Sequence, residues 1–379
     1  MKEAVKLVPQ GEIAFVEFDL PGSSANKFST PVMMRLKEVL EELARSSYKA
    51  VVFVSNKPKI FIAGADIEEI QALKTPEQLF AAVQGGQEIM NMVEDLPMVT
   101  VAAVHGACLG GGCEFILACD YRIASEDKAT RIGLPEVQLG IIPGFGGCVR
   151  LPRVVGLQGA LEIILAGKSV DAKKAQKMGL VDMVVHPSLL RSYAVKFAKE
   201  NISSGKRRKQ YRPVGLVNWL LEGPLKAIVY SQARKNVLKQ THGHYPAPLK
   251  ALEVIKETYR MTDRNRALEI ERKGFGDVGI SDVSKNLIHV YYLTEMVKKS
   301  SGVPGKEVKA RDVNYLGILG AGTMGGGIAY VAADKGIRVR MKDLNLEAVG
   351  RGLKHARDLW MKLLKRKKID KYEFQQRLD

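Results

Sequence analysis

The chain has 379 residues, of which 46% are hydrophobic and 26% are charged. This composition is typical of a globular protein, and the length is sufficient for two or three domains. Aliphatic residues are too frequent for a disordered chain, and no run approaches the roughly 18 apolar residues that a membrane-spanning helix needs. The first residues, which include Lys2 and Glu3, lack the apolar segment of a secretory signal. We therefore expect a soluble, cytoplasmic protein.

Neither the cysteines nor the excess of basic residues indicates a special function. Four cysteines lie between residues 108 and 148 without a C-x-x-C pair or a histidine at ligand spacing, which predicts buried, reduced thiols and no metal site. The formal charge is +17, and basic residues cluster at 206–212 and 354–371. Because no aromatic residues are interleaved with them, we expect solvated surface and no nucleic-acid partner. Such a surface would favour an anionic ligand, for example a phosphorylated cofactor.

The first 120 residues alternate between strand and helix patterns. Short runs of β-branched and aromatic residues predict strands, and helical periodicity follows each of them. The predicted strands are residues 13–18, 50–55 and 99–104, and the predicted helices are residues 30–46, 75–96 and 114–119. Strand, helix, strand, helix in this order indicates a layered α/β domain.

Helical patterns dominate the next part of the chain. Residues 157–178 and 187–200 predict helices, and residues 302–305 are typical of a linker. A second α/β unit begins at Asn314 and continues into one long basic helix. The expected domains are therefore residues 1–190, a mainly helical linker over 191–310, and residues 311–379.

Three glycine-containing segments of the first domain carry the candidate functional residues. The amides of Gly110–Gly112 precede a helix, where glycine lets the backbone approach a ligand and stabilise a developing oxyanion. Glu114 and Glu136 stand in apolar surroundings, and paired carboxyls can divide general-base and general-acid work on one water. Taken singly, Glu114 is better explained as a charge at a helix N-terminus and Glu136 as a surface residue after proline. The segments are Phe61–Ile67, His105–Glu114 and Gly133–Gly147.

Together, the three segments resemble the crotonase, or enoyl-CoA hydratase, superfamily. The matching elements are G-A-D-I, G-A-C-L-G-G-G-C-E and L-P-E-V-x-L-G-x-x-P-G-x-G-G, followed by residues 150–156 and 166–182. The resemblance covers about residues 10–190. It implies a crotonase-like (ClpP/crotonase) α/β fold and the hydratase step of fatty acid β-oxidation, in which water adds to a trans-2-enoyl-CoA.

The resemblance also implies a role for each candidate residue. The backbone amides of Ala65 and Gly111 would form the oxyanion hole for the thioester carbonyl. Glu114 would act mainly as base on the water, and Glu136 would deliver a proton to C2. Hydration would need no cofactor, and because some relatives move the double bond from Δ3 to Δ2 in the same site, we also expect weak isomerase activity. Further contacts to the acyl-CoA would come from Gly64, Asp66, Ile67 and Gly110.

A second motif lies near the end of the chain. Residues 320–325 form G-x-G-x-x-G between a predicted strand and helix, and a second strand over 337–342 ends at Asp343. This context predicts the start of a dinucleotide-binding fold, although a glycine-rich turn without ligand is the alternative. Asp343 would bind the adenosine ribose and favour NAD over NADP. The other expected cofactor-binding residues are Gly320 for the tight turn, Gly322 for the pyrophosphate, Met324, and Gly325 for helix packing.

This order of segments resembles a multifunctional family, the alpha subunits of fatty-acid oxidation complexes, which join an enoyl-CoA hydratase to a 3-hydroxyacyl-CoA dehydrogenase. The resemblance includes the linker motif Gly243–Pro248 and covers nearly the whole chain. In that family a catalytic His–Glu pair lies beyond the position of Asp379. We therefore expect a truncated chain with an incomplete Rossmann-type segment and no dehydrogenase activity. The resemblance implies NAD as cofactor of the full-length family, and a thiolase beta subunit and a homo-oligomer as partners.

Two other classes of function stay open at this point. A non-catalytic acyl-CoA-binding or scaffold protein would bind acyl-CoA without turnover, and its half sheet would leave an unpaired strand edge. A basic nucleic-acid-binding protein would retain RNA in a salt-sensitive manner.

Overall fold

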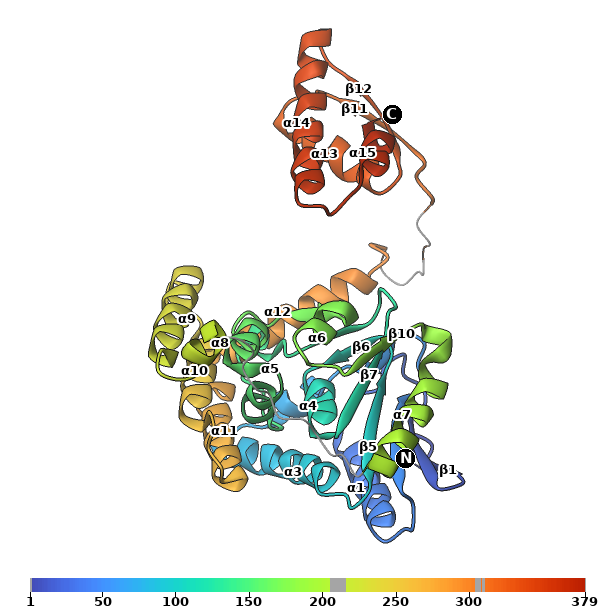
Figure 1. Cartoon of the computed structure of the whole chain (residues 1–379). Coiled ribbons are helices and arrows are strands. Elements are labelled where there is room, and N and C mark those ends of the chain that lie inside the picture. The colour runs from blue at the N-terminus through green and yellow to red at the C-terminus, as the bar shows by residue number, and fades with distance from the viewer. Residues whose placement is uncertain (1, 205–215, 304–307, 309–310, 379) are drawn as a thin grey trace. The chain divides into compact units, whose positions relative to one another are not determined.

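The computed structural model describes residues 2–204, 216–303, 308 and 311–378. The chain forms two compact units, Met1–Met296 and Val297–Asp379 (Figure 1). The basic cluster at 206–212 and part of the expected linker at 302–305 lie outside the described residues. No helix among the described residues is long and apolar enough to cross a membrane. The domain limits at residues 190 and 310 stay predictions.

A six-stranded sheet forms the centre of the first unit. Its order is β1-β2-β3-β5-β7-β10, with β1 and β2 antiparallel and all other neighbours parallel. The predicted strands are confirmed as β2, β3 and β5. Every residue of β5 is buried, as expected for a parallel strand covered on both faces. The bounds are β1 (Val5–Gln10), β2 (Ile13–Phe18), β3 (Ala50–Ser55), β5 (Val99–Val104), β7 (Tyr121–Ser125) and β10 (Met183–Val185).

A second, four-stranded sheet carries the three glycine-containing segments. Its order is β4-β6-β8-β9, and β4, β6 and β8 are parallel. The segments that follow these three strands therefore leave the sheet at the same edge. The strands were not predicted, because three residues are too few for a period-two pattern. Their bounds are β4 (Ile60–Ile62), β6 (Ala107–Leu109), β8 (Arg131–Gly133) and β9 (Ser169–Asp171).

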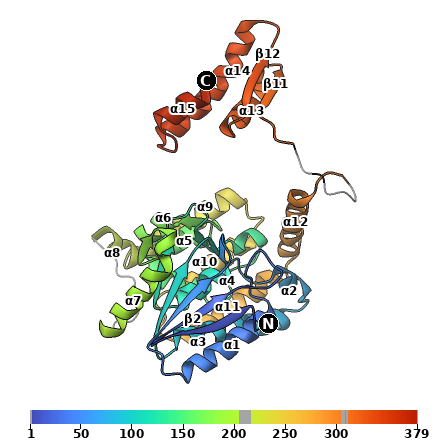
Figure 2. The ribbon, with the colours of Figure 1, turned by 90° about the vertical axis from the view of Figure 1, so that its right-hand side faces the viewer.

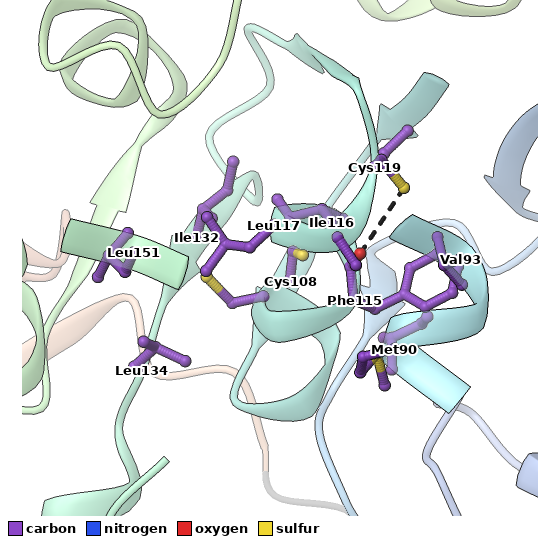
Figure 3. Packing of buried hydrophobic residues seen from close by; sticks show 14 of the residues in the cluster. Met90, Val93, Cys108, Phe115, Ile116, Leu117, Cys119, Ile132, Leu134 and Leu151 are labelled. Atoms are coloured by element: carbon purple, nitrogen blue, oxygen red, sulfur yellow. Dashed lines mark hydrogen bonds between the residues drawn. The ribbon is translucent and has the colours of Figure 1, made fainter. Parts of the chain in front are cut away.

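Hydrophobic clusters pack on both faces of the six-stranded sheet. Alternate residues of β3 point to opposite faces, and α7 (Leu190–Ser204) covers one of them. The other face packs against α4 (Gly111–Ala118), in which every residue is buried. The four cysteines are buried and free, as predicted. Figure 3 shows the packing around α4, with Phe115, Ile116 and Leu117 near Met90, Val93, Cys108, Ile132, Leu134 and Leu151.

Helices surround this core, and three of the predicted ones are confirmed, including the one over residues 187–200, most of which forms α7. The expected helices at 30–46 and 75–96 form as α1 (Thr30–Ala44) and α3 (Pro76–Glu94). A capping box starts α3, in which Thr75 and Gln78 exchange side-chain and backbone hydrogen bonds. The third predicted helix begins earlier than expected, because the glycine run itself forms the first turn of α4.

The single helix predicted over residues 157–178 is wrong. The chain instead forms α5 (Gly147–Ile164), then β9, then α6 (Ala172–Lys177). Gly167 has φ 56° and turns the chain out of the helix after α5. The Asp171 side chain accepts a hydrogen bond of 2.8 Å from the Lys174 amide and so begins α6 as a separate element.

The described part of residues 191–296 is mainly helical and belongs to the first unit (Figure 2). α10 packs against α5, and α11 packs against α3. This arrangement places residues from late in the chain beside the glycine-containing segments. The helices are α8 (Leu216–Glu222), α9 (Lys226–Thr241), α10 (Pro246–Thr258), α11 (Arg264–Gly279) and α12 (Asp282–Lys299).

The second unit begins with a parallel β-α-β arrangement, β11 (Tyr315–Leu319), α13 (Thr323–Asp334) and β12 (Arg338–Lys342). The single long basic helix expected after it is wrong, because α14 (Leu346–Lys365) and α15 (Lys371–Leu378) are separate. Lys367 has φ 54° and ends α14, and Ile369 turns inward against Trp360. Asp370 and Glu373 then exchange hydrogen bonds that start α15.

Candidate active site

The segments that follow β4, β6 and β8 meet along one cavity of about 700 Å³. Most of its lining is apolar, and α3 and α11 contribute side chains such as Ile89 and Phe275. Because parallel strands end at the same edge of a sheet, residues far apart in sequence come together here. Their roles stay predictions. The predicted residues on the lining are Gly64, Ala65, Asp66, Ile67, Gly110, Gly111, Glu114 and Glu136.

Two backbone amides lie side by side on the cavity lining. A Cβ placed on Gly111 would lie 3.4 Å from the nitrogen of Ala65. The adjacent amide on each segment already has an acceptor: the N–H of Asp66, after Ala65, donates to Phe28 C=O, and the N–H of Gly110, before Gly111, donates to Gly133 C=O, both at 3.0 Å. Neither Ala65 nor Gly111 donates to an acceptor within the part of the chain that the structure describes. The two N–H groups can therefore share one ligand oxygen.

Glycine is required where these two segments approach. Gly64 has φ 122° and Gly110 has φ 53°, and residues with side chains rarely adopt such values. A Cβ on Gly64 would also lie 3.3 Å from the Leu109 carbonyl oxygen. The turns that bring the two amides together thus depend on glycine for both conformation and space.

Glu114 lies in the first turn of α4 and is held by backbone amides. Only 2% of its surface is exposed. One carboxyl oxygen, Oε1, accepts hydrogen bonds from Phe145 N–H at 2.7 Å and from Gly147 N–H at 2.8 Å. No lysine, arginine or histidine among the described residues forms an ion pair with this carboxyl. The carboxylate of Glu114 is therefore stabilised by amide dipoles rather than by a cation.

Glu136 begins the short 3₁₀ helix η1 (Glu136–Leu139) and is 9% exposed. Its Oε2 atom is buried and has no hydrogen-bond partner among the described residues. Its Oε1 atom lies over Gly110, where a Cβ would be 3.1 Å away. An unpartnered carboxyl oxygen in a cavity is costly unless it contacts a ligand.

Burial strongly perturbs both carboxyls. It raises the pKa of Glu136 to about 8. It also raises the pKa of Glu114 well above its usual value, with a further increase from the charge of Glu136, whereas the amides of Gly147 and Phe145 lower it. Two carboxyls in one low-dielectric cavity do not both ionise near neutral pH. Glu114 alone accepts two amide hydrogen bonds, and these favour the ionised form of its carboxyl.

Other residues of this region have structural contacts or were not predicted. The Asp66 side chain caps α2 (Ile67–Ala72) and pairs with Lys27 at 2.6 Å. Phe145 fills the space beside Gly86; it lies in the third glycine-containing segment, whose motif alone predicts no role for it. Glu271 in α11 also reaches this region, and no spacing or motif in the sequence could have indicated it.

The glycine loop of the second unit has the local geometry of a dinucleotide site. Gly320 has φ 96°, and a Cβ on Gly325 would lie 1.9 Å from the Gly320 carbonyl oxygen, so that position must be glycine. No heavy atom lies within 4 Å of a Cβ placed on Gly322. The carboxyl of Asp343 accepts a 2.6 Å hydrogen bond from Ala321 N–H, which lowers its pKa and links the end of β12 to the loop.

The fold and the site together define a protein of the crotonase type, an α/β enzyme domain whose cavity is bordered by paired amides and carboxyls. The chain belongs to the enoyl-CoA hydratase/isomerase family, whose sequence model matches residues 9–211. Residues 315–379 match the NAD-binding domain of 3-hydroxyacyl-CoA dehydrogenases. Both resemblances seen in the sequence, and the expected α/β fold with a Rossmann-type segment, are confirmed.

Several solved structures are similar to this chain. An enoyl-CoA hydratase from Bacillus anthracis is 30% identical, with 67% of this chain and 96% of that chain covered and a TM-score of 0.49. An enoyl-CoA hydratase/isomerase from Xanthobacter autotrophicus is 22% identical, covering 80% and 99%, with a TM-score of 0.55. Human mitochondrial delta3-delta2-enoyl-CoA isomerase is 22% identical, covering 78% and 100%, with a TM-score of 0.53. The last two likenesses show the fold.

The raised pKa of Glu136 predicts a pH-dependent stability. In the unfolded chain this carboxyl loses its proton near its ordinary value of 4.5, whereas in the folded chain it keeps the proton until about pH 8. The free energy of unfolding therefore falls as pH rises across this range. Glu136→Gln has no carboxyl to ionise, so it is not destabilised in this way as pH rises. The difference in melting temperature, variant minus wild type, should therefore increase by several degrees from pH 5 to pH 8. Thermal unfolding at pH 5, 6.5 and 8 measures this difference.

Glu126→Gln provides the control, because this carboxyl is exposed. Its melting temperature should follow that of the wild type at every pH. If Glu136→Gln also ran parallel to the wild type from pH 5 to pH 8, Glu136 would not hold a proton in the folded protein.

Proposed function

We propose that this chain adds water across the double bond of a trans-2-enoyl-CoA to give the 3-hydroxyacyl-CoA, as an enoyl-CoA hydratase of fatty acid β-oxidation. One observation carries the proposal: two unpartnered amides and two carboxyls of different environment border the same cavity. The family match supports acyl-CoA as the substrate class. The finer details of substrate and roles rest on the geometry described above.

The two amides fit the charge that develops during hydration. When water attacks C3 of the enoyl thioester, the electrons of the double bond move toward the thioester oxygen and form an enolate. The N–H groups of Ala65 and Gly111 would donate to that oxygen from fixed positions, so no reorganisation is needed as the charge grows. In this arrangement Gly64, Asp66, Ile67 and Gly110 form the wall against which the acyl-CoA lies.

The two carboxyls would complete the addition by moving protons. Glu114, which carries the charge, takes a proton from the water as its oxygen bonds to C3. Glu136, which carries the proton, delivers it to C2 of the enolate. The sum is one water added and one double bond removed. The pair is reset when the proton passes from Glu114 to Glu136 through the next water.

Hydration of crotonyl-CoA, measured by the loss of the conjugated thioester absorbance, tests these roles. Glu114→Gln and Glu136→Gln should each lower kcat by about 10²–10⁴, because each removes one proton transfer. The exposed Glu126→Gln should retain the wild-type rate. Full activity in either site variant would contradict the assigned roles, and binding of crotonyl-CoA by the wild type without turnover would support a scaffold function instead.

The same site supports Δ3–Δ2 enoyl-CoA isomerisation as a second activity. That reaction needs one carboxyl to carry a proton between C4 and C2, and Glu136 lies on the cavity lining with one oxygen that has no hydrogen-bond partner among the described residues. Isomerisation would therefore depend on Glu136 more than on Glu114.

We further propose that residues 315–379 bind NAD. The open space at Gly322 lets a pyrophosphate approach the N-terminus of α13, where the helix dipole favours it. Each oxygen of Asp343 accepts one amide hydrogen bond, from Ala321 or Leu344, and keeps a lone pair for a ribose hydroxyl. Met324, which is 78% exposed, borders the same loop. When bound, NAD supplies a hydride acceptor, and these residues hold it.

NAD binding can be tested at Gly322 without disturbing the fold. A Cβ at this position lies more than 4 Å from the heavy atoms of the described residues other than its chain neighbours, so Gly322→Val should stay folded while its side chain blocks the pyrophosphate. Gly327→Val is the matched control, because that position in α13 is equally open. Calorimetric titration should show affinity for NAD at least tenfold lower in Gly322→Val and unchanged in the control. Absence of NAD binding to the wild type would overturn this proposal.

Association with a thiolase beta subunit and with further copies of the chain stays a prediction from the family resemblance.

A further inference from the structure

A third buried carboxyl lies behind the cavity, on the far side of the segment that holds Glu114. Glu271 of α11 is completely buried. Its Oε1 accepts a hydrogen bond from Gly146 N–H at 2.6 Å, and its Oε2 accepts one from Cys148 N–H at 2.8 Å. This residue lies outside the part of the chain that matches the family, residues 9–211.

The amides of residues 145–148 are divided between two carboxyls. Those of Phe145 and Gly147 donate to Glu114, and those of Gly146 and Cys148 donate to Glu271. Four successive N–H groups thus point alternately to opposite sides of the chain. Both carboxyls must be in place for all four buried amides to be satisfied, because an unsatisfied buried N–H is costly.

The position of Glu271 is itself fixed by its neighbours. Gln87 of α3 donates from Nε2 to Glu271 Oε1 at 3.1 Å, and the same Nε2 donates to the Gly144 carbonyl at 2.9 Å. The Arg150 guanidinium donates to the Phe145 carbonyl at 3.0 Å and pairs with Glu94 at 2.9 Å. Helices α3, α5 and α11 therefore all hold the 145–148 segment.

We propose that Glu271 is a positioning residue for hydration, which holds residues 145–148 in the one arrangement that presents two amides to the Glu114 carboxylate. The proposal rests on the hydratase function proposed above. Without Glu271, the amides of Gly146 and Cys148 lose their acceptors and the segment turns to find others. The amides of Phe145 and Gly147 then leave Glu114, which loses both its fixed orientation and the donors that stabilise its charge.

Glu271 also contributes charge to the site. Burial raises its pKa to about 7, while Gln87, the two amides and Arg150 lower it. The ionised form raises the pKa of Glu136, of Glu114 and of the Cys148 thiol. Near pH 8 Glu271 is ionised, and its charge helps Glu136 to keep the proton that the reaction needs.

Two variants separate positioning from charge. Glu271→Gln keeps the size of the side chain but offers only one oxygen to the two amides and carries no charge. Glu271→Asp keeps the charge and both oxygens on a shorter side chain. Glu222→Gln is the matched control, because Glu222 is also a buried carboxyl that accepts from a backbone amide, that of Leu157, and it does not line the cavity.

With crotonyl-CoA, we expect Glu271→Gln to lower kcat by roughly 10–100-fold with KM changed less than about threefold, because a displaced carboxylate affects the transition state more than binding. Loss of the charge lowers the pKa of Glu136, so the fall of kcat/KM at high pH should move to lower pH by roughly half a unit or more. Glu271→Asp keeps the charge, so it should recover part of kcat and leave the pH at which kcat/KM falls unchanged. Glu222→Gln should lower the melting temperature without changing kcat or the pH at which kcat/KM falls.

Hydrogen exchange provides a readout that does not require activity. In Glu271→Gln the amides of residues 145–148 should exchange at least tenfold faster than in the wild type, and in Glu222→Gln they should not. Unchanged exchange and kcat in Glu271→Gln would overturn the proposal. An inactive wild type would contradict the hydratase function, while the exchange comparison would still decide whether Glu271 holds the segment.

Discussion

The structure of this site depends on keeping two carboxyls in a mostly apolar cavity without a cation beside them. A carboxylate removed from water must be compensated, and among the described residues neither Glu114 nor Glu136 forms an ion pair. The compensation is unequal. Glu114 receives two amide hydrogen bonds, whereas Glu136 has a buried oxygen to which no described residue donates. This inequality allows one carboxyl to serve as base and the other as acid at the same pH.

The fold supplies these groups through the ends of three very short parallel strands. β4, β6 and β8 each direct a glycine-containing segment to one edge, where Ala65 and Gly111 present their amides and Glu114 and Glu136 their carboxyls. Helix α11, from much later in the chain, contributes Glu271, which accepts hydrogen bonds from the amides of Gly146 and Cys148. The other two amides of residues 145–148 donate to Glu114. The family match ends before this helix, so the support of the site extends beyond the matched residues.

Much of this could be predicted from the sequence, and the exceptions have physical causes. The strands at 50–55 and 99–104 were evident because buried parallel strands are continuous apolar runs, and Glu114 and Glu136 stood out as acids among apolar residues. The helix predicted over 157–178 failed because the turn at Gly167 and the cap at Asp171 override helical periodicity. Glu271 could not be predicted, since its role arises only from the packing of α11 against the 145–148 segment.

The most direct test of the account is the protonation state of the two carboxyls near neutral pH. Infrared spectroscopy of the protein with ¹³C-labelled glutamate, recorded from pH 6 to pH 10, distinguishes protonated from ionised side chains. We expect one protonated carboxyl band that disappears around pH 8, from Glu136, and another that disappears around pH 7, from Glu271. Glu136→Gln should lose only the band that persists to pH 8, and Glu114→Gln should keep it. A band lost in Glu114→Gln but kept in Glu136→Gln would reverse the assignment of base and acid. No protonated carboxyl at pH 7 would contradict the account altogether.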